Sequence, residues 1–333
     1  MTVLAKEYEL WSFVFERLKR GRDVMLLVVA ESEGSSPGRR GYKMAVDDDR
    51  ELVGSVGGGV MEVRLVEQCR AMLRGTADSV SGESPTVELS EQVHRKDVHN
   101  SSGMICSGRQ TVIFKRLGPS DVESVELAMA SFREHRTQVL QITPSLFTVS
   151  FTSVSSEIQD FDFETTSEKD FRYREMLGPK NHLYIVGGGH CSLALSELMS
   201  KMDFCVHIFD DRPELNTIEK NRFADVITIV DSYDSIADHI PAGRNSYVAV
   251  MTLGYKSDGV VIRNLISADF KYFGVLGSRA KMAALLKELR EDGIPAERLS
   301  NVKTPIGLAI QSRTPEEIAV SIAAEIISVK NAD

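Results

Sequence analysis

The chain has 333 residues, of which 42% are hydrophobic and 26% charged, and its formal net charge is −9. This length and composition are typical of a globular protein with two domains, each able to bury its own core. The acidic balance disfavours a nucleic-acid or membrane surface, and no apolar run reaches the roughly 20 residues of a membrane helix.

The first 20 residues have the spacing of an amphipathic helix and carry Glu7, Glu9 and Glu16, which is unlike a signal peptide. The four cysteines contain no C-x-x-C pair, so their spacing indicates neither a zinc knuckle nor a disulfide framework. We therefore expect a cytoplasmic protein.

Residues 1–175 predict an α+β domain. The polar C-terminal end of this region, at about residues 153–175, shows no hydrophobic periodicity, which predicts a linker. The expected strands are Val24–Ala30, Met44–Val46, Leu52–Val56, Thr86–Leu89, Gln110–Leu117, Val139–Ile142 and Leu146–Phe151, and the expected helices are Val60–Arg74 and Asp121–His135.

Residues 180–333 alternate short apolar strands with helical periodicity, which predicts a doubly wound parallel sheet of the Rossmann type. The final helix has a clear start, because Thr314 is a good N-cap, Pro315 fits the first position and Glu317 completes a capping box. The expected strands are His182–Val186, Cys205–Asp210, Val226–Val230, Tyr247–Met251 and Tyr272–Leu276.

A glycine-rich turn follows the first of these strands and opens a helix. Its glycines are Gly187, Gly188 and Gly189, with His190 next, and Asp210 and Asp211 end the following strand. Bare N–H groups at a helix start favour a phosphate, and a carboxylate at the second strand favours a ribose. The alternatives are a tight turn in a non-binding sheet and aspartates that cap their own turn.

A second turn at the same sheet edge consists of Gly277, Ser278 and Arg279 before another helix. Its amides, hydroxyl and guanidinium favour a second phosphate contact. Simple capping by Ser278 is the alternative.

The N-terminal part has a glycine turn of its own, formed by Gly57, Gly58 and Gly59 ahead of Glu62. An upstream loop contributes Ser35 and Arg39, and the combination favours a phosphorylated ligand over solvated loop charge. Cys106 precedes a strand, where it is either a thiol held at a rim or an ordinary buried cysteine.

The order of these motifs resembles the xanthine dehydrogenase accessory proteins of the XdhC and CoxI family. The resemblance rests on Gly34-Ser-Ser-Pro37, Gly54 to Glu62, Gly187-Gly-Gly-His190, Phe209-Asp-Asp-Arg212, Gly274 to Arg279 and Thr314 to Ser321, and it spans nearly the whole chain.

The resemblance implies a maturation factor that binds the molybdenum cofactor, molybdopterin or its dinucleotide form, and delivers it to a molybdenum hydroxylase such as xanthine dehydrogenase. It also implies a cysteine desulfurase as partner and a homodimer. No side-chain catalysis is expected, and Cys106 is the candidate metal ligand because thiolate suits molybdenum.

Five positions depart from the family pattern. Gly38 stands where an arginine is frequent, Val60 replaces a cysteine, Ser107 replaces a glycine after Cys106, and Leu253 and Tyr255 replace two histidines. Two other functions stay open: an NAD(P)-dependent oxidoreductase, which needs a proton donor such as His190 or Tyr255, and a scaffold that binds no cofactor.

Overall fold

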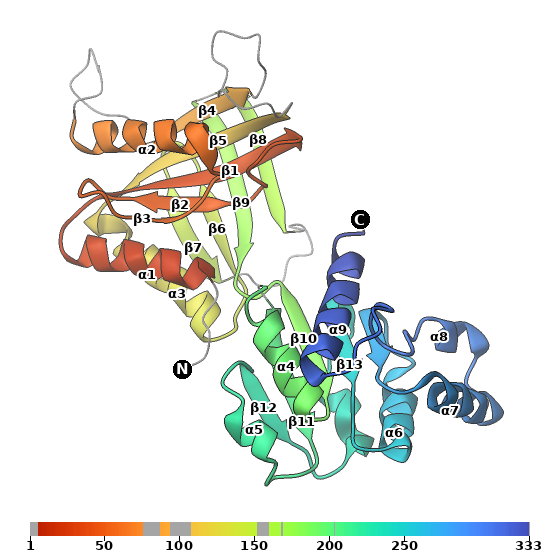
Figure 1. The fold of residues 1–333 in the computed structure, drawn as a ribbon. Helices are drawn as coiled ribbons and strands as arrows, with labels where there is room; N and C mark the ends of the chain where they lie inside the picture. Colours follow the sequence, from red (N-terminus) through yellow and green to blue (C-terminus); the bar gives the residue numbers. More distant parts are fainter. Residues whose placement is uncertain are drawn as a thin grey trace. The chain divides into compact units, whose positions relative to one another are not determined.

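The structure is a computed structural model that describes residues 6–75, 87–93, 108–151, 160–167, 169–202 and 204–332. The chain divides into two units, one ending at Gly178 and the other beginning at Pro179 (Figure 1).

The N-terminal unit is built on an antiparallel sheet whose described strands follow the order β3-β2-β1-β5-β4. The hairpin expected around Asp47–Arg50 is confirmed, since β2 pairs with β3 from Met44–Gly54 to Val46–Leu52. The strands are β1 (Val24–Gly34), β2 (Lys43–Val46), β3 (Leu52–Gly54), β4 (Val87–Val93) and β5 (Gly108–Leu117).

Both faces of this sheet are covered, because side chains alternate between them along each strand. Met25, Leu27 and Val29 pack with the buried stripe of α2 (Gly59–Leu73). Leu26 and Val28 belong to a second core, with residues of α1 (Lys6–Lys19), α3 (Val122–Arg133) and the next sheet. A short η1 turn (Pro119–Asp121) precedes α3.

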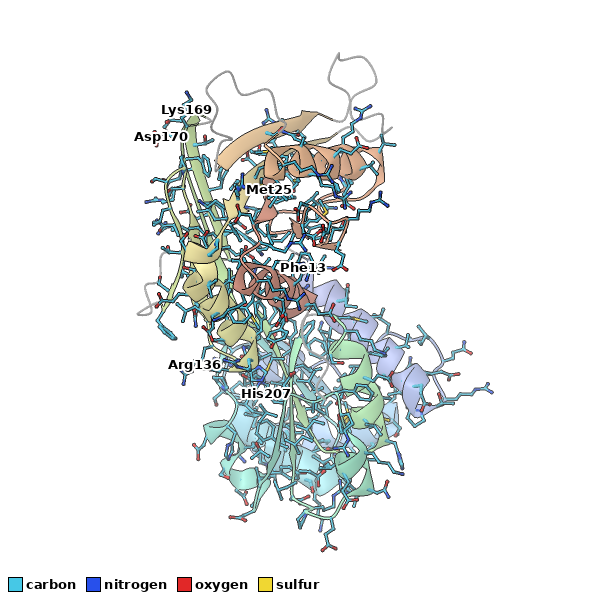
Figure 2. All side chains as sticks on the ribbon, turned by 90° about the vertical axis from the view of Figure 1, so that its left-hand side faces the viewer. Phe13, Met25, Arg136, Lys169, Asp170 and His207 are labelled. Carbon is cyan, nitrogen blue, oxygen red and sulfur yellow. The ribbon has the colours of Figure 1, made fainter. Side chains whose placement is uncertain are left out.

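The second sheet has the order β7-β6-β9-β8 and corrects the expected linker. Its strands are β6 (Gln138–Ile142), β7 (Phe147–Phe151), β8 (Phe161–Ser167) and β9 (Asp170–Leu177). The polar stretch after residue 160 therefore forms a hairpin, which turns near Lys169 and Asp170 (Figure 2). Its polarity reflects an edge position, because β8 pairs on one side only and exposes its last four residues.

The C-terminal unit is the predicted doubly wound parallel sheet. Its order is β12-β11-β10-β13-β14, and every described pair is parallel. The chain order reverses between β10 and β13, which makes their carboxyl ends the switch point where such sheets bind ligands. The strands are β10 (Asn181–Val186), β11 (Phe204–Asp210), β12 (Val226–Ile229), β13 (Gly243–Val250) and β14 (Phe270–Val275).

Helices cover both faces of this sheet (Figure 1). One core contains side chains of α4 (His190–Met199) and α9 (Pro315–Lys330), and the other contains side chains of η2 (Tyr233–Asp238), α6 (Tyr255–Leu265) and α7 (Arg279–Glu291). Short helices α5 (Asn216–Lys220) and α8 (Ala296–Ser300) complete the unit. The capping box of Thr314 and Glu317 is present as predicted, and the α/β fold class is confirmed.

Candidate functional site

The C-terminal glycine turn, Gly187–Gly189, connects β10 to α4 at the switch point. Gly187 has a φ of 108°, and a Cβ there would strike the Met251 carbonyl oxygen, so the position requires glycine. Gly189 is the N-cap of α4, and a Cβ there would meet nothing within 4 Å. The turn therefore leaves open space before the first N–H groups of α4, as an anion site requires.

Asp210, at the end of β11, is fully buried and holds this turn in place. Its Oδ2 accepts a hydrogen bond from the Gly188 N–H over 2.6 Å and another from Arg212 Nη2 over 2.7 Å. Its Oδ1 accepts from the backbone N–H and Nε of Arg212 over 2.9 and 2.8 Å. Each carboxylate oxygen thus has two donors from within the chain, a number that fills its usual capacity.

Arg212 gains a fixed position from this pairing. Burial acts to raise the pKa of Asp210, but the hydrogen bonds from Arg212 and Gly188 outweigh burial and lower it. The same contact raises the pKa of Arg212. The Arg212 side chain is 34% exposed, so a guanidinium that pairs with Asp210, and lies 3.8 Å from Asp211 Oδ1, also reaches solvent beside the glycine turn.

His190 and Asp211 flank the same turn. His190 is the first residue of α4 and is exposed. The Asp211 backbone N–H donates to the Tyr233 hydroxyl over 3.3 Å, and that hydroxyl donates to the Asp211 carboxylate over 3.4 Å. Both side chains are accessible at the edge where the sequence placed them.

The Gly277–Arg279 turn lies at the carboxyl end of β14, the outer strand. Ser278 is the N-cap of α7, and its Oγ accepts the Lys281 N–H over 3.3 Å. The capping interpretation is therefore confirmed for Ser278. Gly277 is packed against Met282, whereas Arg279 is exposed at the start of α7.

Sequence reasoning missed a buried carboxylate between these loops. Asp258 in α6 is 1% exposed, accepts the Thr252 hydroxyl over 2.6 Å and pairs with Lys281 Nζ over 3.3 Å. Burial raises the pKa of Asp258, although Thr252 and Lys281 act to lower it. The group ties the loop after β13 to the first turns of α6 and α7, and no local sequence pattern signals its burial.

The N-terminal glycine turn already contains an anion from the chain itself. Glu62 Oε2 accepts hydrogen bonds from the Ser55 hydroxyl over 2.6 Å, the Val56 N–H over 2.9 Å and the Gly58 N–H over 3.0 Å. Amides expected to face an external phosphate are thus directed at Glu62. This carboxylate orders the turn, and an external anion would compete with it.

The upstream loop packs against this turn through Gln110 of β5. Gln110 Oε1 accepts from the Ser36 hydroxyl over 2.8 Å and the Gly38 N–H over 3.3 Å, while Nε2 donates to the Val56 carbonyl over 3.3 Å. Ser35 and Arg39 lie on the exposed side of the loop. Cys106 lies outside the described residues.

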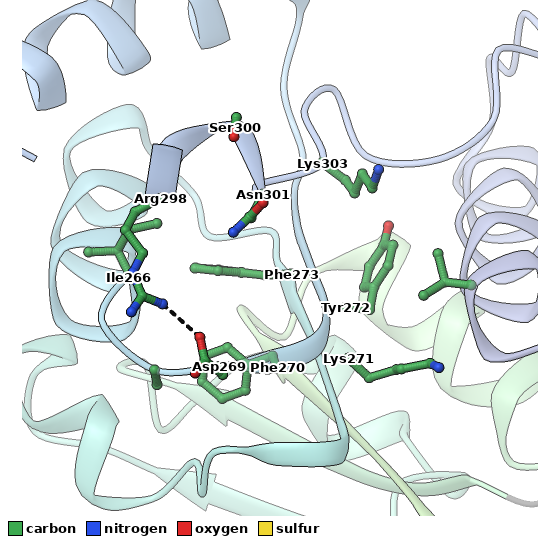
Figure 3. A pocket seen from close by; sticks show the side chains of 12 residues that line it. Ile266, Asp269, Phe270, Lys271, Tyr272, Phe273, Arg298, Ser300, Asn301 and Lys303 are labelled. Atoms are coloured by element: carbon green, nitrogen blue, oxygen red, sulfur yellow. Dashed lines mark hydrogen bonds and ion pairs between the residues drawn. The ribbon is translucent and has the colours of Figure 1, made fainter. Parts of the chain in front are cut away.

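A cavity of about 290 Å³ lies elsewhere, beside the amino end of β14 (Figure 3). None of the residues predicted for the site lines it, and Arg298 pairs with Asp269 at its wall over 2.6 Å. Its other lining side chains include Ile266, Phe270, Lys271, Tyr272, Phe273, Ser300, Asn301 and Lys303.

Comparison with known proteins agrees with both halves of this architecture. Residues 183–326 match the XdhC Rossmann domain, and residues 17–81 match the XdhC and CoxI family. The chain belongs to the XdhC and CoxI family. The glycine turn, Asp210 and Arg212 therefore lie within the XdhC Rossmann domain.

Two curated relatives align with about half of the chain. The uncharacterized protein YqeB of Escherichia coli is 27% identical over 154 residues, which is 46% of this chain and 28% of that protein. A probable xanthine dehydrogenase subunit of Bacillus subtilis is 30% identical over 156 residues, 47% of this chain and 45% of that protein. This XdhC chain thus matches less than half the length of either relative.

A solved structure has a similar fold over the whole length. The crystal structure of a xanthine dehydrogenase from Bacillus halodurans matches with a TM-score of 0.71 and 20% identity, covering 100% of this chain and 96% of that one. Within the part of this XdhC chain that the structure describes, no helix is both long and apolar enough to cross a membrane.

Leu253 and Tyr255, which stand where the family resemblance implies histidines, lie after β13. Leu253 is 83% exposed, and the Tyr255 hydroxyl hydrogen bonds Glu288. Leu253 offers no ligand atom, and the Tyr255 hydroxyl already has a carboxylate partner. Neither residue supplies the imidazole that the family resemblance implies at its position.

Proposed function

We propose that this chain is an accessory protein that binds the molybdenum cofactor by its phosphate-bearing tail and delivers it to a molybdenum hydroxylase. One observation carries the proposal: Asp210 holds Arg212 beside the open turn at Gly189. A fixed guanidinium next to helix N–H groups is complementary to a phosphate in both charge and donor geometry.

The hydrogen-bond donors beside the glycine turn fit a phosphate group better than a ribose hydroxyl. Because Asp210 has all its acceptor positions filled by Gly188 and Arg212, a ribose hydroxyl would have to displace a bond that already exists. Arg279 and His190 are exposed and supply further donors for a tail of one or two phosphates. In the N-terminal unit, the exposed Ser35 and Arg39 are proposed as phosphate contacts of that unit.

When bound, the cofactor would supply the molybdenum dithiolene centre that the client enzyme uses. The residues of this chain would hold the tail and carry out no bond-making step. Support for such a client comes from the relatives, two of which are described as xanthine dehydrogenase proteins. A cysteine desulfurase and a second copy of the chain are the further partners that the family resemblance implies.

The sharpest test introduces a negative charge at position 189 and compares it with a neutral side chain of the same size. Gly189→Asp and Gly189→Asn add side chains of equal size at a position with open space, and both are good N-caps. Only the aspartate puts a negative charge where the phosphate would lie. Full-length protein is incubated with molybdopterin released from a denatured molybdenum hydroxylase, and retained pterin is measured by fluorescence after gel filtration.

We expect Gly189→Asp to retain at least about ten-fold less pterin than Gly189→Asn, because a like charge close to the ligand costs more than about 1.4 kcal/mol. Equal retention by the two variants would remove the glycine turn from the proposal. Gly188 is a poorer position for this test, because a Cβ there would lie 2.6 Å from Ile218 carbons and disturb the turn itself.

The alternative function is tested by adding NADPH as a competitor of molybdopterin. Retention of NADPH in place of pterin would favour an NAD(P)-dependent oxidoreductase.

A further inference from the structure

Three potential metal ligands converge at the opposite end of the parallel sheet from the glycine turn. His182 Nδ1 lies 3.2 Å from His207 Nε2, and Cys205 Sγ lies 3.3 Å from the same nitrogen. The three ligand atoms all lie within 4.8 Å of one another. Cys205 is buried, whereas both histidines are partly exposed.

Strand register produces this convergence. His182 of β10 is paired with Cys205 of β11, and His207 is two residues further along β11. Residues two apart point to the same face of a sheet, so all three side chains leave the same face at the same end. The cluster precedes Gly187 by about five residues, or about 16 Å of extended strand. It is therefore separate from the proposed phosphate site.

Two of the three ligand separations are close to those of a tetrahedral metal site, and the third, between His182 Nδ1 and Cys205 Sγ, is within 4.8 Å. Zinc binds imidazole nitrogen at about 2.0–2.1 Å and thiolate sulfur at about 2.3 Å, which places neighbouring ligand atoms roughly 3.3–3.6 Å apart. Both separations from His207 Nε2 lie within a few tenths of an ångström of this range. Two imidazoles and one thiolate form a donor set that selects borderline ions such as zinc over magnesium or calcium.

The surroundings hold the ligands in position. Tyr184 stacks on the His207 ring with centroids 4.7 Å apart, which restricts rotation of the imidazole. Asp225 interacts with the Cys205 thiol, and its Oδ2 accepts the Val206 N–H over 2.7 Å.

We propose that His182, Cys205 and His207 bind one divalent transition-metal ion of borderline softness, such as zinc. Binding replaces the S–H bond of Cys205 by a metal–sulfur bond and releases the proton to solvent. The ion joins the amino ends of β10 and β11 and acts structurally. This site could not be predicted from local sequence, because His182 and His207 are 25 residues apart and only the pairing of β10 with β11 brings them together.

Cobalt(II) is the probe that tests the site, since cobalt bound to thiolate has a charge-transfer band in the near ultraviolet. Reduced, metal-free, full-length protein is titrated with CoCl₂, and we expect the band to saturate at one equivalent per chain and to disappear when ZnCl₂ is added. Cys205→Ser should abolish the band, and His207→Ala should weaken cobalt binding by more than about ten-fold. MgCl₂ should leave the band unchanged.

The matched control is Cys191→Ser, which removes a partly exposed thiol of α4 outside the cluster and should leave the titration unaltered. Because a change at buried Cys205 can disturb folding, His182→Ala at a partly exposed position provides a second variant. Zinc should raise the unfolding temperature of the unmodified chain and not that of His182→Ala. No saturable band, or an equal band in Cys205→Ser, would overturn the proposal.

Discussion

Gly38 lies directly against the backbone carbonyl of Val56, with no room for a Cβ atom between them. The contact joins the loop that begins at Gly34 to the start of the N-terminal glycine turn, and Gln110 bonds both partners from the sheet below. The two loops that were expected to bind one phosphorylated ligand are therefore packed directly against each other.

The space around each glycine predicts a larger loss of stability for substitution of Gly38 than for substitution of Gly254. Gly38→Ala should lower the free energy of unfolding by about 1–3 kcal/mol, because the methyl group would collide with Val56 and with Gln110 Oε1. Gly254 has a φ of −145° and nothing within 4 Å of an added Cβ, so Gly254→Ala should change stability by less than about 1 kcal/mol. Urea unfolding of both variants measures the difference, and equal values would contradict the contact.

Gln110 should be more important to the N-terminal unit than a glutamine at the sheet surface. It is 1% exposed, and Gln110→Leu would deprive the Ser36 hydroxyl and the Val56 carbonyl of their partner. We expect a loss of about 2–3 kcal/mol and faster proteolysis near residues 34–41. The control is Gln141→Leu in β6, which is partly exposed and should cost less than about 0.5 kcal/mol.

The buried ammonium of Lys43 should be far more sensitive than a surface lysine. Its Nζ lies 2.7 Å from both Glu7 and Glu175, and the Lys43 side chain is 3% exposed. Burial acts to lower the pKa of Lys43, but the two carboxylates outweigh burial and raise it.

Lys43→Met should cost about 3–5 kcal/mol, since two carboxylates lose their buried cation. Lys201→Met breaks the exposed Lys201–Glu197 pair and should cost under about 1 kcal/mol. Thermal and urea unfolding compare the two. If Lys43→Met lowered the free energy of unfolding by no more than Lys201→Met, the buried pairing of Lys43 with Glu7 and Glu175 would not be required for stability.

The depressed pKa of Asp210 predicts an acid-dependent stability in the C-terminal unit. A carboxyl whose folded pKa is below its unfolded value of about 3.9 stabilises the fold at higher pH, and this contribution is lost as pH falls through the folded pKa. Between about pH 5 and pH 3, wild-type protein should therefore lose more stability than Asp210→Asn, whose amide does not titrate. Parallel slopes for the two proteins would contradict the predicted coupling to Gly188 and Arg212.

Most elements of the fold could be predicted from sequence, because the patterns that define them extend over only a few residues. The alternating strands of the C-terminal unit, the hairpin at Asp47–Arg50 and the capping box at Thr314 are all present. The stretch after residue 160 was predicted wrongly, since an edge strand with one solvated face lacks the apolar alternation that identifies a strand.

The candidate site was predicted only in part. Sequence placed Gly187–Gly189 and Asp210 at one sheet edge, as the parallel order requires. It gave no indication that Arg212 fills the acceptor positions of Asp210 or that Glu62 occupies the amides of its own glycine turn. Those outcomes depend on which donor lies within about 3 Å of a given oxygen, and spacing along the chain does not determine that distance.

Residue type and local order were enough to establish the family, the class of fold and the glycine turns. Long-range packing was needed to show how Gln110 joins two loops, how Asp258 is buried, and how His182 meets Cys205 and His207. The cause is strand register: pairing between distant strands sets side chains beside each other, and a shift of one residue would turn them to opposite faces.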